Sequence, residues 1–256
     1  MMRNRYAAVC LFLMFFALTV QAQDDPPRNE VEVRGTFSIP SGESMFTRNG
    51  ITGSTIDFSR DFDFGNELGY EIRYTYKSEN KRHKIVADWA DTNWDRTRTL
   101  SRSFTFLGQT YVANLDATAG LSLREFRAMY SYRWGNEKFR IGPMADMGVI
   151  STRLNITGTT NQGTRSGEVT TTKFAATLGY DLDYDPNSKI NLFHNLGAIV
   201  FQGEHLFHTE GGVKYFPTRN FGITGGYRFQ RYKLEDGSDF ITVRNNGPFA
   251  GGILRF

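Results

Sequence analysis

The sequence predicts an all-β fold, a transmembrane antiparallel up-and-down β-barrel of about ten strands. Three observations support this prediction. Apolar and polar residues alternate along many segments, short polar turns alternate with long connections, and the chain ends on an apolar, strand-like segment, GPFAGGILRF (247–256). Successive side chains of a strand point to opposite faces, so this alternation gives each strand one apolar and one charged face, as strands of a membrane barrel require.

The first 22 residues have the layout of a secretory signal peptide. Arg3 and Arg5 precede a largely apolar run (7–20), and a small-x-small cleavage motif ends at Ala22. We therefore expect cleavage after Ala22, which leaves residues 23–256 as a single barrel domain. An uncleaved anchor is the alternative, but a spanning helix needs ~20 apolar residues and this run is shorter.

The composition of the mature chain excludes several classes of protein. The whole sequence has 30 Lys and Arg against 27 Asp and Glu, and losing Arg3 and Arg5 leaves 28 against 27. No basic excess remains for binding nucleic acid. The single cysteine, Cys10, lies in the predicted signal peptide. We therefore expect no disulfide, no cysteine metal site and no cofactor.

Ten segments of the mature chain are predicted to be strands. The alternation is clearest in EVEVRGTFSI (30–39), LGYEIRYTYK (68–77), EFRAMYSYRW (125–134) and KFAATLGYDLDY (173–184). It is looser in FRIGPMADMGVI (139–150) and FGITGGYRFQRY (221–232), and KINLFHNLGAIVF (189–201) is apolar on both faces. The predicted strands span residues 30–40, 67–78, 83–97, 121–134, 138–153, 170–185, 189–202, 208–216, 221–233 and 247–256.

The connections between these strands are of two kinds. Four are short and rich in turn residues: SENK (78–81), GNEK (135–138), DPNSK (185–189) and PTRN (217–220). They alternate with long connections at residues 41–66, 98–120, 155–170, 203–208 and 233–246. We expect 41–66 and 156–172 to be polar, solvent-facing segments that extend the strands, and 102–115 to form a hairpin that turns near Gly108. If residues 203–216 pair differently, the barrel has eight strands instead of ten.

A soluble β-sandwich or lipocalin-like barrel is the alternative to a membrane barrel. Its apolar faces would point inward and would consist mostly of Val, Ile, Leu and Phe. In this sequence Tyr and Trp gather at the ends of the apolar faces, as in Tyr74 and Tyr76, or Tyr132 and Trp134. Such clustering at strand ends is typical of the aromatic girdles at a membrane interface.

With these features the chain resembles bacterial outer-membrane β-barrel proteins of the small, monomeric porin-like or OmpA-like class, over nearly the whole mature chain. The resemblance implies a monomer in the outer membrane of a Gram-negative envelope, in contact with outer-membrane lipids and lipopolysaccharide. It also implies recognition by the barrel-insertion machinery, which reads a last strand ending in an aromatic residue. Leu254 and Phe256 match that signal, while Ala250 and Gly252 on the same face are smaller than the usual residues.

The inward faces of the strands are predicted to carry charges of both signs. A selective pore tends to have rings of one sign, whereas a mixed set predicts ion pairs that plug the lumen. Open channels appear at ~16–18 strands, and ten strands lie nearer the plugged limit. We expect a structural or surface-interaction barrel, with a narrow channel for small solutes or ions as the alternative. The predicted lumen charges are Arg34, Glu71, Arg73, Asp88, Glu125, Arg127, Arg140, Asp146, Asp181 and Arg228.

An enzyme is a further hypothesis, because omptin-type proteases resemble this chain in size and strand count, and some barrels modify lipid A. An omptin needs acidic and Asp-His pairs at the outer rim, but no Asp-x-His motif occurs, and His205 and His208 lie three residues apart, on opposite faces of a strand. A barrel deacylase carries a His-Ser pair, but His194 has no adjacent serine. We therefore expect no catalytic, cofactor or metal site.

Overall fold

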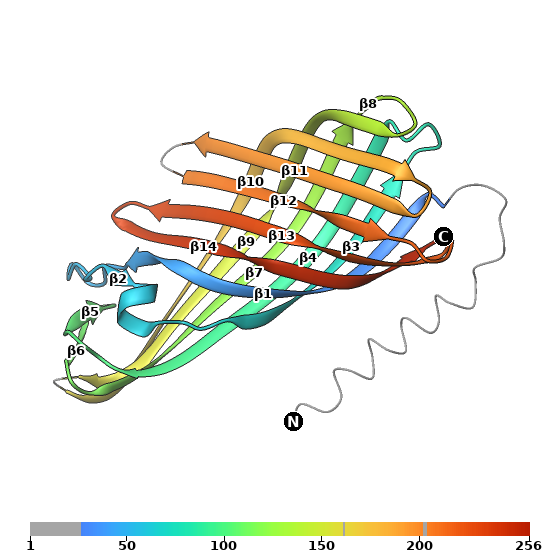
Figure 1. Cartoon of the computed structure of the whole chain (residues 1–256). Helices are drawn as coiled ribbons and strands as arrows, with labels where there is room; N and C mark the ends of the chain where they lie inside the picture. The colour runs from blue at the N-terminus through green and yellow to red at the C-terminus, as the bar shows by residue number, and fades with distance from the viewer. Residues whose placement is uncertain (1–26, 161, 202–203) are drawn as a thin grey trace.

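The computed structural model describes residues 27–160, 162–201 and 204–256, so the predicted signal peptide lies outside the described residues. Ten long strands form one closed antiparallel sheet (Figure 1). They are β1 (Asn29–Met45), β3 (Glu67–Lys77), β4 (His83–Thr99), β7 (Asp116–Tyr132), β9 (Phe139–Thr160), β10 (Gly163–Asn187), β11 (Ile190–Phe201), β12 (Glu204–Tyr215), β13 (Phe221–Asp236) and β14 (Asp239–Arg255). The prediction of ten strands is confirmed, and the eight-strand alternative is wrong.

The barrel is closed by its first and last strands. In β1 and β14, Val31 lies opposite Leu254 and Val33 lies opposite Gly252. The backbones of Asn29 and Phe256 exchange two hydrogen bonds of 3.0 Å. No strand edge is therefore left unpaired along this seam, which is the condition for strands that lie in hydrocarbon.

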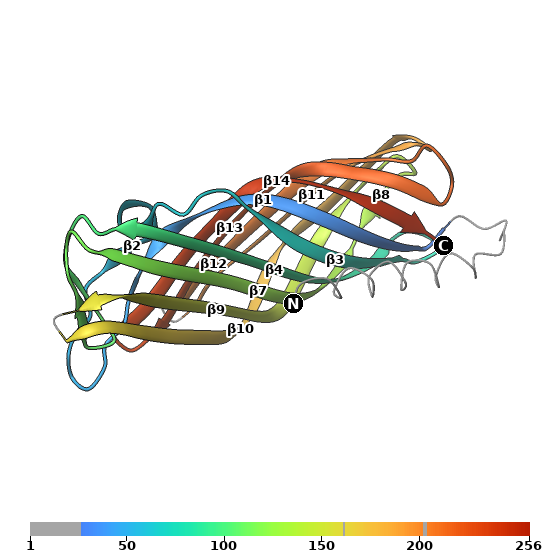
Figure 2. The same cartoon turned by 90° about the horizontal axis from the view of Figure 1, so that it is seen from below.

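At one end of the barrel the strands reach to different heights. We call the end with Asn29 and Phe256 the inner end and the opposite end, with Gly237, the outer end. At the outer end β9 and β10 reach far beyond the outer ends of β11 and β12 (Figures 1 and 2). β9 and β10 are therefore longer at their outer ends than the ranges predicted from alternation, 138–153 and 170–185.

Four short strands and one helical turn complete the fold. β5 (Phe104–Phe106) and β6 (Gln109–Tyr111) form the hairpin predicted near Gly108, where Leu107 and Gly108 adopt φ angles of 50° and 76°. β2 (Ile56–Asp57) pairs with β1, and β8 (Trp134–Gly135) pairs with β9. A π-helical turn, η1 (Phe58–Phe62), follows β2 and is capped by the side chain of Asp57. Among the described residues, no helix is both long enough and apolar enough to cross a bilayer.

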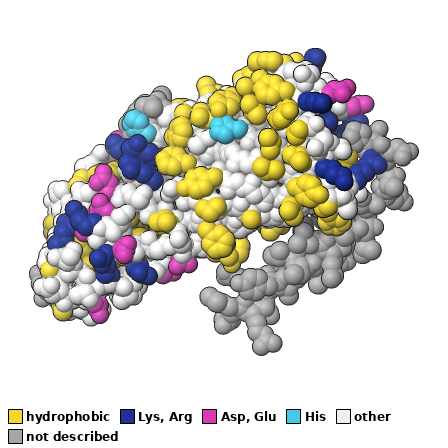
Figure 3. All heavy atoms as spheres, viewed as in Figure 1, with side chains coloured by type: hydrophobic (Ala, Val, Ile, Leu, Met, Phe, Trp, Pro, Cys, Tyr) yellow, Lys and Arg dark blue, Asp and Glu magenta, His cyan; other side chains and the backbone are white. Residues whose placement is uncertain are grey.

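The outer surface near the inner end is apolar, and the space-filling view shows it as a broad hydrophobic band (Figure 3). Leu178 is 69% exposed and Phe126 53% exposed, whereas Thr75 and Ser131 on the other face are buried. At the outer end the inward face of the strands becomes apolar and the outward face becomes polar. Next to Phe126 on the same strand, Leu121 and Leu123 are buried inside the barrel, while Arg124 points outward.

The apolar interior at the outer end corrects the expectation that residues 41–66 are a polar, solvent-facing segment. Their aromatic residues fold into the barrel, as do those of the β5–β6 hairpin. We call this group the outer aromatic core. Its main members are Phe46, Ile56, Phe58, Phe62, Phe64, Trp94, Leu100, Phe104, Phe106 and Tyr111. Water surrounds this part of the barrel, so burying apolar side chains inside it is favourable.

Candidate functional site

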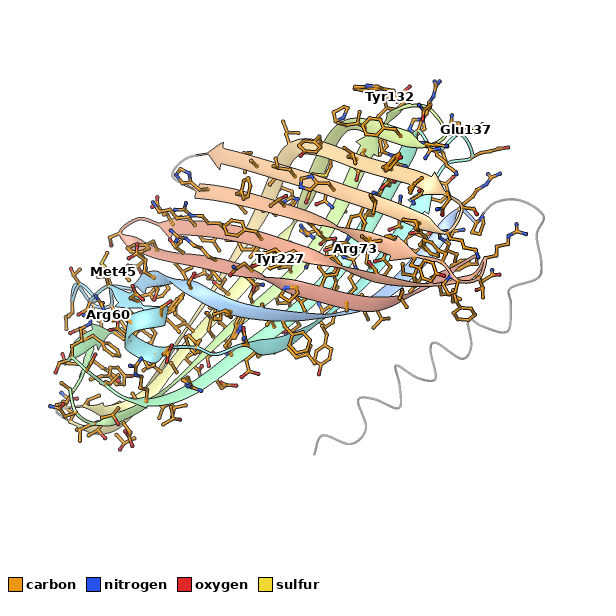
Figure 4. The ribbon with its side chains drawn as sticks, in the orientation of Figure 1. Met45, Arg60, Arg73, Tyr132, Glu137 and Tyr227 are labelled. Carbon is orange, nitrogen blue, oxygen red and sulfur yellow. The ribbon has the colours of Figure 1, made fainter. Side chains whose placement is uncertain are left out.

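The lumen at the level of the apolar band holds a continuous set of ion pairs, the lumen network, and its centre is Glu210. This carboxylate on β12 is 2% exposed and accepts hydrogen bonds from three arginines. Arg34 on β1 and Arg73 on β3 each donate at 2.7 Å, and Arg228 on β13 also donates at 2.7 Å. Arg228 lies directly opposite Glu210 on the neighbouring strand, whereas Arg34 and Arg73 tie β1 and β3 to β12 across the lumen. Figure 4 shows Arg73 midway along the barrel.

Further ion pairs extend the network in two directions. Arg228 binds Glu71 at 2.5 Å, and Arg73 lies 3.4 Å from Asp88. Arg127 binds the same Asp88 at 3.1 Å and lies 3.7 Å from Asp146. Seven of the ten predicted lumen charges therefore meet in this central part: Arg34, Glu71, Arg73, Asp88, Arg127, Asp146 and Arg228.

The network continues toward the inner end. Lys214 binds both Glu30 and Glu32, and Glu32 pairs with Arg34. Lys77 links Glu30 to Asp183, which also pairs with Arg133 and lies 3.5 Å from Lys84. Asp181 joins this part, because Lys84 donates to it at 2.8 Å. Counted over the described residues, nine basic and eight acidic side chains are connected, so the charges nearly cancel. They are Arg34, Arg73, Lys77, Lys84, Arg127, Arg133, Lys214, Arg228 and Arg255, with Glu30, Glu32, Glu71, Asp88, Asp146, Asp181, Asp183 and Glu210.

Two predicted residues lie outside this chain of ion pairs. Arg140 binds Asp185 at 3.0 Å near the inner mouth, apart from the rest. Glu125 is buried but accepts a hydrogen bond of 2.9 Å from the neutral amide of Gln230. The central acceptor, Glu210, is not among the predicted lumen charges. It lies on the same face of β12 as Lys214, four residues before it, so the alternation along β12 was a sufficient signal.

Little space remains inside the network. A cavity of about 20 Å³ lies between Arg127, Lys84 and His208, and another of about 10 Å³ lies beside Glu125 and Arg228. One water molecule needs roughly 10–15 Å³, so the first cavity has room for about one and the second for one at most. At the inner mouth a polar vestibule of about 1030 Å³ opens between the turns, lined by Lys81, Glu137 and other charged residues.

The outer aromatic core closes the lumen above the network. Its helical turn η1 is held by Asp61, which accepts hydrogen bonds of 2.9 and 2.6 Å from Arg102. Burial raises the pKa of the Asp61 carboxyl, but the hydrogen bonds from Arg102 and Arg60 outweigh burial and lower this pKa below its ordinary value. Ring pairs such as Phe62 with Phe104, at 5.9 Å between centroids, fill the space beneath.

The histidines of β11 and β12 lie apart from one another in the described part of the chain. His208 points into the lumen, 3.5 Å from Asp146, and His205 is exposed on the other face of β12. His194 contacts the hydroxyl of Thr209 at 3.1 Å. Within the described parts of the chain, no group of three or more His, Cys, Asp and Glu side chains is arranged to hold a metal ion.

The sequence matches the family described as "outer membrane protein beta-barrel domain" over residues 8–229. The chain belongs to this family and is a protein of the bacterial outer membrane. No curated protein matches it. Among solved structures, the outer membrane protease OmpT from Escherichia coli has 12% identity and a TM-score of 0.55, over 93% of this chain and 100% of that one. The translocator domain of the autotransporter NalP from Neisseria meningitidis has 8% identity and a TM-score of 0.47, over 98% of this chain and 96% of that one. At such identities the similarity concerns the fold alone.

Proposed function

We propose that this protein is a structural outer-membrane barrel that is closed to solutes and presents its tall outer strands as an interaction surface outside the cell. The observation that carries the proposal is the filling of the lumen in two layers. Ion pairs occupy it at the level of the apolar band, and aromatic side chains occupy it above. A permeant ion would have to break buried pairs whose loss costs ~3–5 kcal/mol each.

A narrow channel is the alternative function, and the polar vestibule at the inner mouth favours it. Such a channel would require the lumen network to rearrange and the outer aromatic core to move aside. Protease activity is not part of the proposal, because the fold similarity to OmpT carries no residue across. Of the two acids that the sequence RDFDF offers at the rim, Asp61 and Asp63, the first is bound to Arg102, and His208 lies deep in the lumen.

Conductance in planar bilayers tests the proposal. The purified barrel, reconstituted next to an open barrel of ~16 strands as positive control, should give no unitary current steps. Steps from the wild-type protein that change in size when Arg228 is replaced by Gln would contradict it, because the current would then pass Arg228. Steps from Arg228→Gln alone would mean that the lumen network, and not the outer aromatic core, keeps the wild-type lumen closed.

A further inference from the structure

The outer face of β12, β13 and β14 carries a basic cluster at the edge of the apolar band. It consists of His205, Arg231, Lys233 and Arg244, which all point away from the lumen. Figure 3 shows Lys and Arg atoms gathered beside a histidine at this edge, over the outer ends of these strands. The mature chain has almost no net charge, so this local excess is not a property of the whole surface.

The register of the strands makes the cluster unusual. Arg231 lies directly opposite Arg244 in the β13–β14 ladder, and Lys233 lies opposite His205 in the β12–β13 ladder. Like charges placed directly opposite each other destabilise a sheet. Among the described residues, neither Arg231 nor Arg244 has an ion pair or a side-chain hydrogen bond, whereas Lys233 pairs with Glu235 at 2.5 Å. The two guanidiniums are therefore free to bind an anion that would remove their repulsion.

The position of the cluster indicates where that anion comes from. On β13 the outward residues from Phe221 to Phe229 are apolar or aromatic, and Arg231 is the next outward residue. These nine residues match the ~9–11 that a tilted strand needs to cross the hydrocarbon core. Arg231 and Arg244 thus lie at the level of the lipid headgroups on the outer side. Arginine forks bind phosphate oxygens in a bidentate manner.

A shallow groove of about 520 Å³ joins these side chains to the hydroxyls of Ser41 and Ser59. Two acids, Glu43 and Asp57, lie on its other side, and Asp57 is occupied in capping η1. Ser41 lies directly opposite Arg244 in the β1–β14 ladder, so the cations of the groove and a hydroxyl donor lie together at the edge of the apolar band. A phosphorylated glycolipid, with its acyl chains on the apolar band and its sugars above, matches this order of groups.

We propose that Arg231 and Arg244, with His205 and Lys233 beside them, form a binding site for a phosphate group of lipopolysaccharide in the outer leaflet. The site is on the outside of the barrel. It depends on the membrane placement of the barrel and not on whether the lumen conducts, so it can fail or hold independently of the closed-barrel proposal.

The test measures the binding of lipopolysaccharide to the full mature barrel in neutral detergent micelles, with native and enzymatically dephosphorylated lipopolysaccharide as probes. The double variant Arg231→Gln, Arg244→Gln should bind the native form about thirtyfold more weakly than wild type, as expected for two arginines at an anionic surface. The double lysine variant should retain part of the affinity. Dephosphorylated lipopolysaccharide should bind wild type and the glutamine variant equally weakly.

Arg124→Gln is the matched control. Arg124 is also the first outward residue past the apolar band, next to Phe126 on β7, but it is paired with Asp91 at 3.0 Å. This variant should bind native lipopolysaccharide like wild type. The proposal is overturned if the glutamine double variant keeps wild-type affinity, or if dephosphorylation of the lipid makes no difference to wild type. It is also overturned if inorganic phosphate or an acidic peptide competes for the site as well as the lipid binds.

Discussion

Replacing Glu210 by Gln tests whether the lumen network depends on its central carboxylate. The substitution preserves the shape of the side chain but removes a buried negative charge that accepts five hydrogen bonds from Arg34, Arg73 and Arg228, four of them at 2.7–3.1 Å. Removing one partner of a buried ion pair costs ~3–5 kcal/mol, because the other charge stays buried without compensation. With three arginines affected, we expect the free energy of unfolding to fall by at least that amount.

The assay is reversible unfolding of the barrel by guanidinium chloride in lipid vesicles, followed by tryptophan fluorescence, with linear extrapolation to zero denaturant. Glu168→Gln is the control. Glu168 pairs with Arg153 on the outer surface, where both side chains are about half exposed, and such pairs contribute ~0–1 kcal/mol. If Glu210→Gln costs no more than Glu168→Gln, the reasoning about the network is wrong. Adding Arg73→Gln to Glu210→Gln should cost less than the sum of the single changes, since it removes one of the uncompensated charges.

Three further predictions concern the membrane face, the outer plug and the closing strand. Leu178→Arg should lower the free energy of unfolding by ~2–4 kcal/mol if Leu178 lies near the middle of the bilayer, whereas Thr172→Arg, further out on the same face of β10, should have little effect; equal losses would contradict the assigned band. Because the pKa of Asp61 is lowered in the folded state, its contribution to stability is present above the unfolded value of ~3.9 and is lost as the pH falls through the folded value. The protection of residues 54–62 against hydrogen exchange, taken relative to the intrinsic exchange rate at each pH, should therefore fall below about pH 4 in wild type, and in Asp61→Asn this protection should already be low at neutral pH and should not change over that range. Deleting Phe256 should reduce the yield of heat-modifiable, membrane-inserted barrel more than deleting Gln162 in an outer turn, and insertion at the wild-type level would argue against a role for Phe256 in closing the barrel.

The strand count and the facing of the strands follow from the sequence, because the period of two is an intrinsic property of extended backbone. Glu210 follows from the same rule. Its pair with Arg228 follows from the β12–β13 ladder, where the two residues lie directly opposite each other, but its pairs with Arg34 and Arg73 do not, because those arginines lie on strands far apart in the chain and meet Glu210 only across the closed lumen. Alternation assigns a side chain to a face but gives no partner on the opposite wall.

The outer aromatic core could not be predicted in the same way. Phe46, Phe58, Phe62 and Phe64 have no regular spacing, and the residues between them are polar. Their burial depends on a helical turn, on the capping by Asp57 and on the pair between Asp61 and Arg102, which joins two loops 41 residues apart. These are tertiary contacts, and they override the local polar composition that favours an exposed loop.

The change of character along the strands links the fold to its surroundings. On β7 the outward face passes from Phe126 to Arg124 at the level where the inward face passes from Glu125 to Leu123. On β9, Val149 lies opposite Phe126 in the ladder, and the next outward residue, Ser151, lies opposite Arg124. The strands remain continuous across this level, so the backbone does not cause the change. The solvent does, because hydrocarbon outside the barrel requires apolar outward side chains and provides no hydrophobic drive for an apolar interior. Water outside the barrel reverses both requirements. The level at which the outward face becomes polar and the inward face becomes apolar therefore marks the outer boundary of the bilayer, without reference to an exposed aromatic girdle. The same reasoning assigns Arg231, the first outward residue beyond Phe229, to the level of the lipid headgroups.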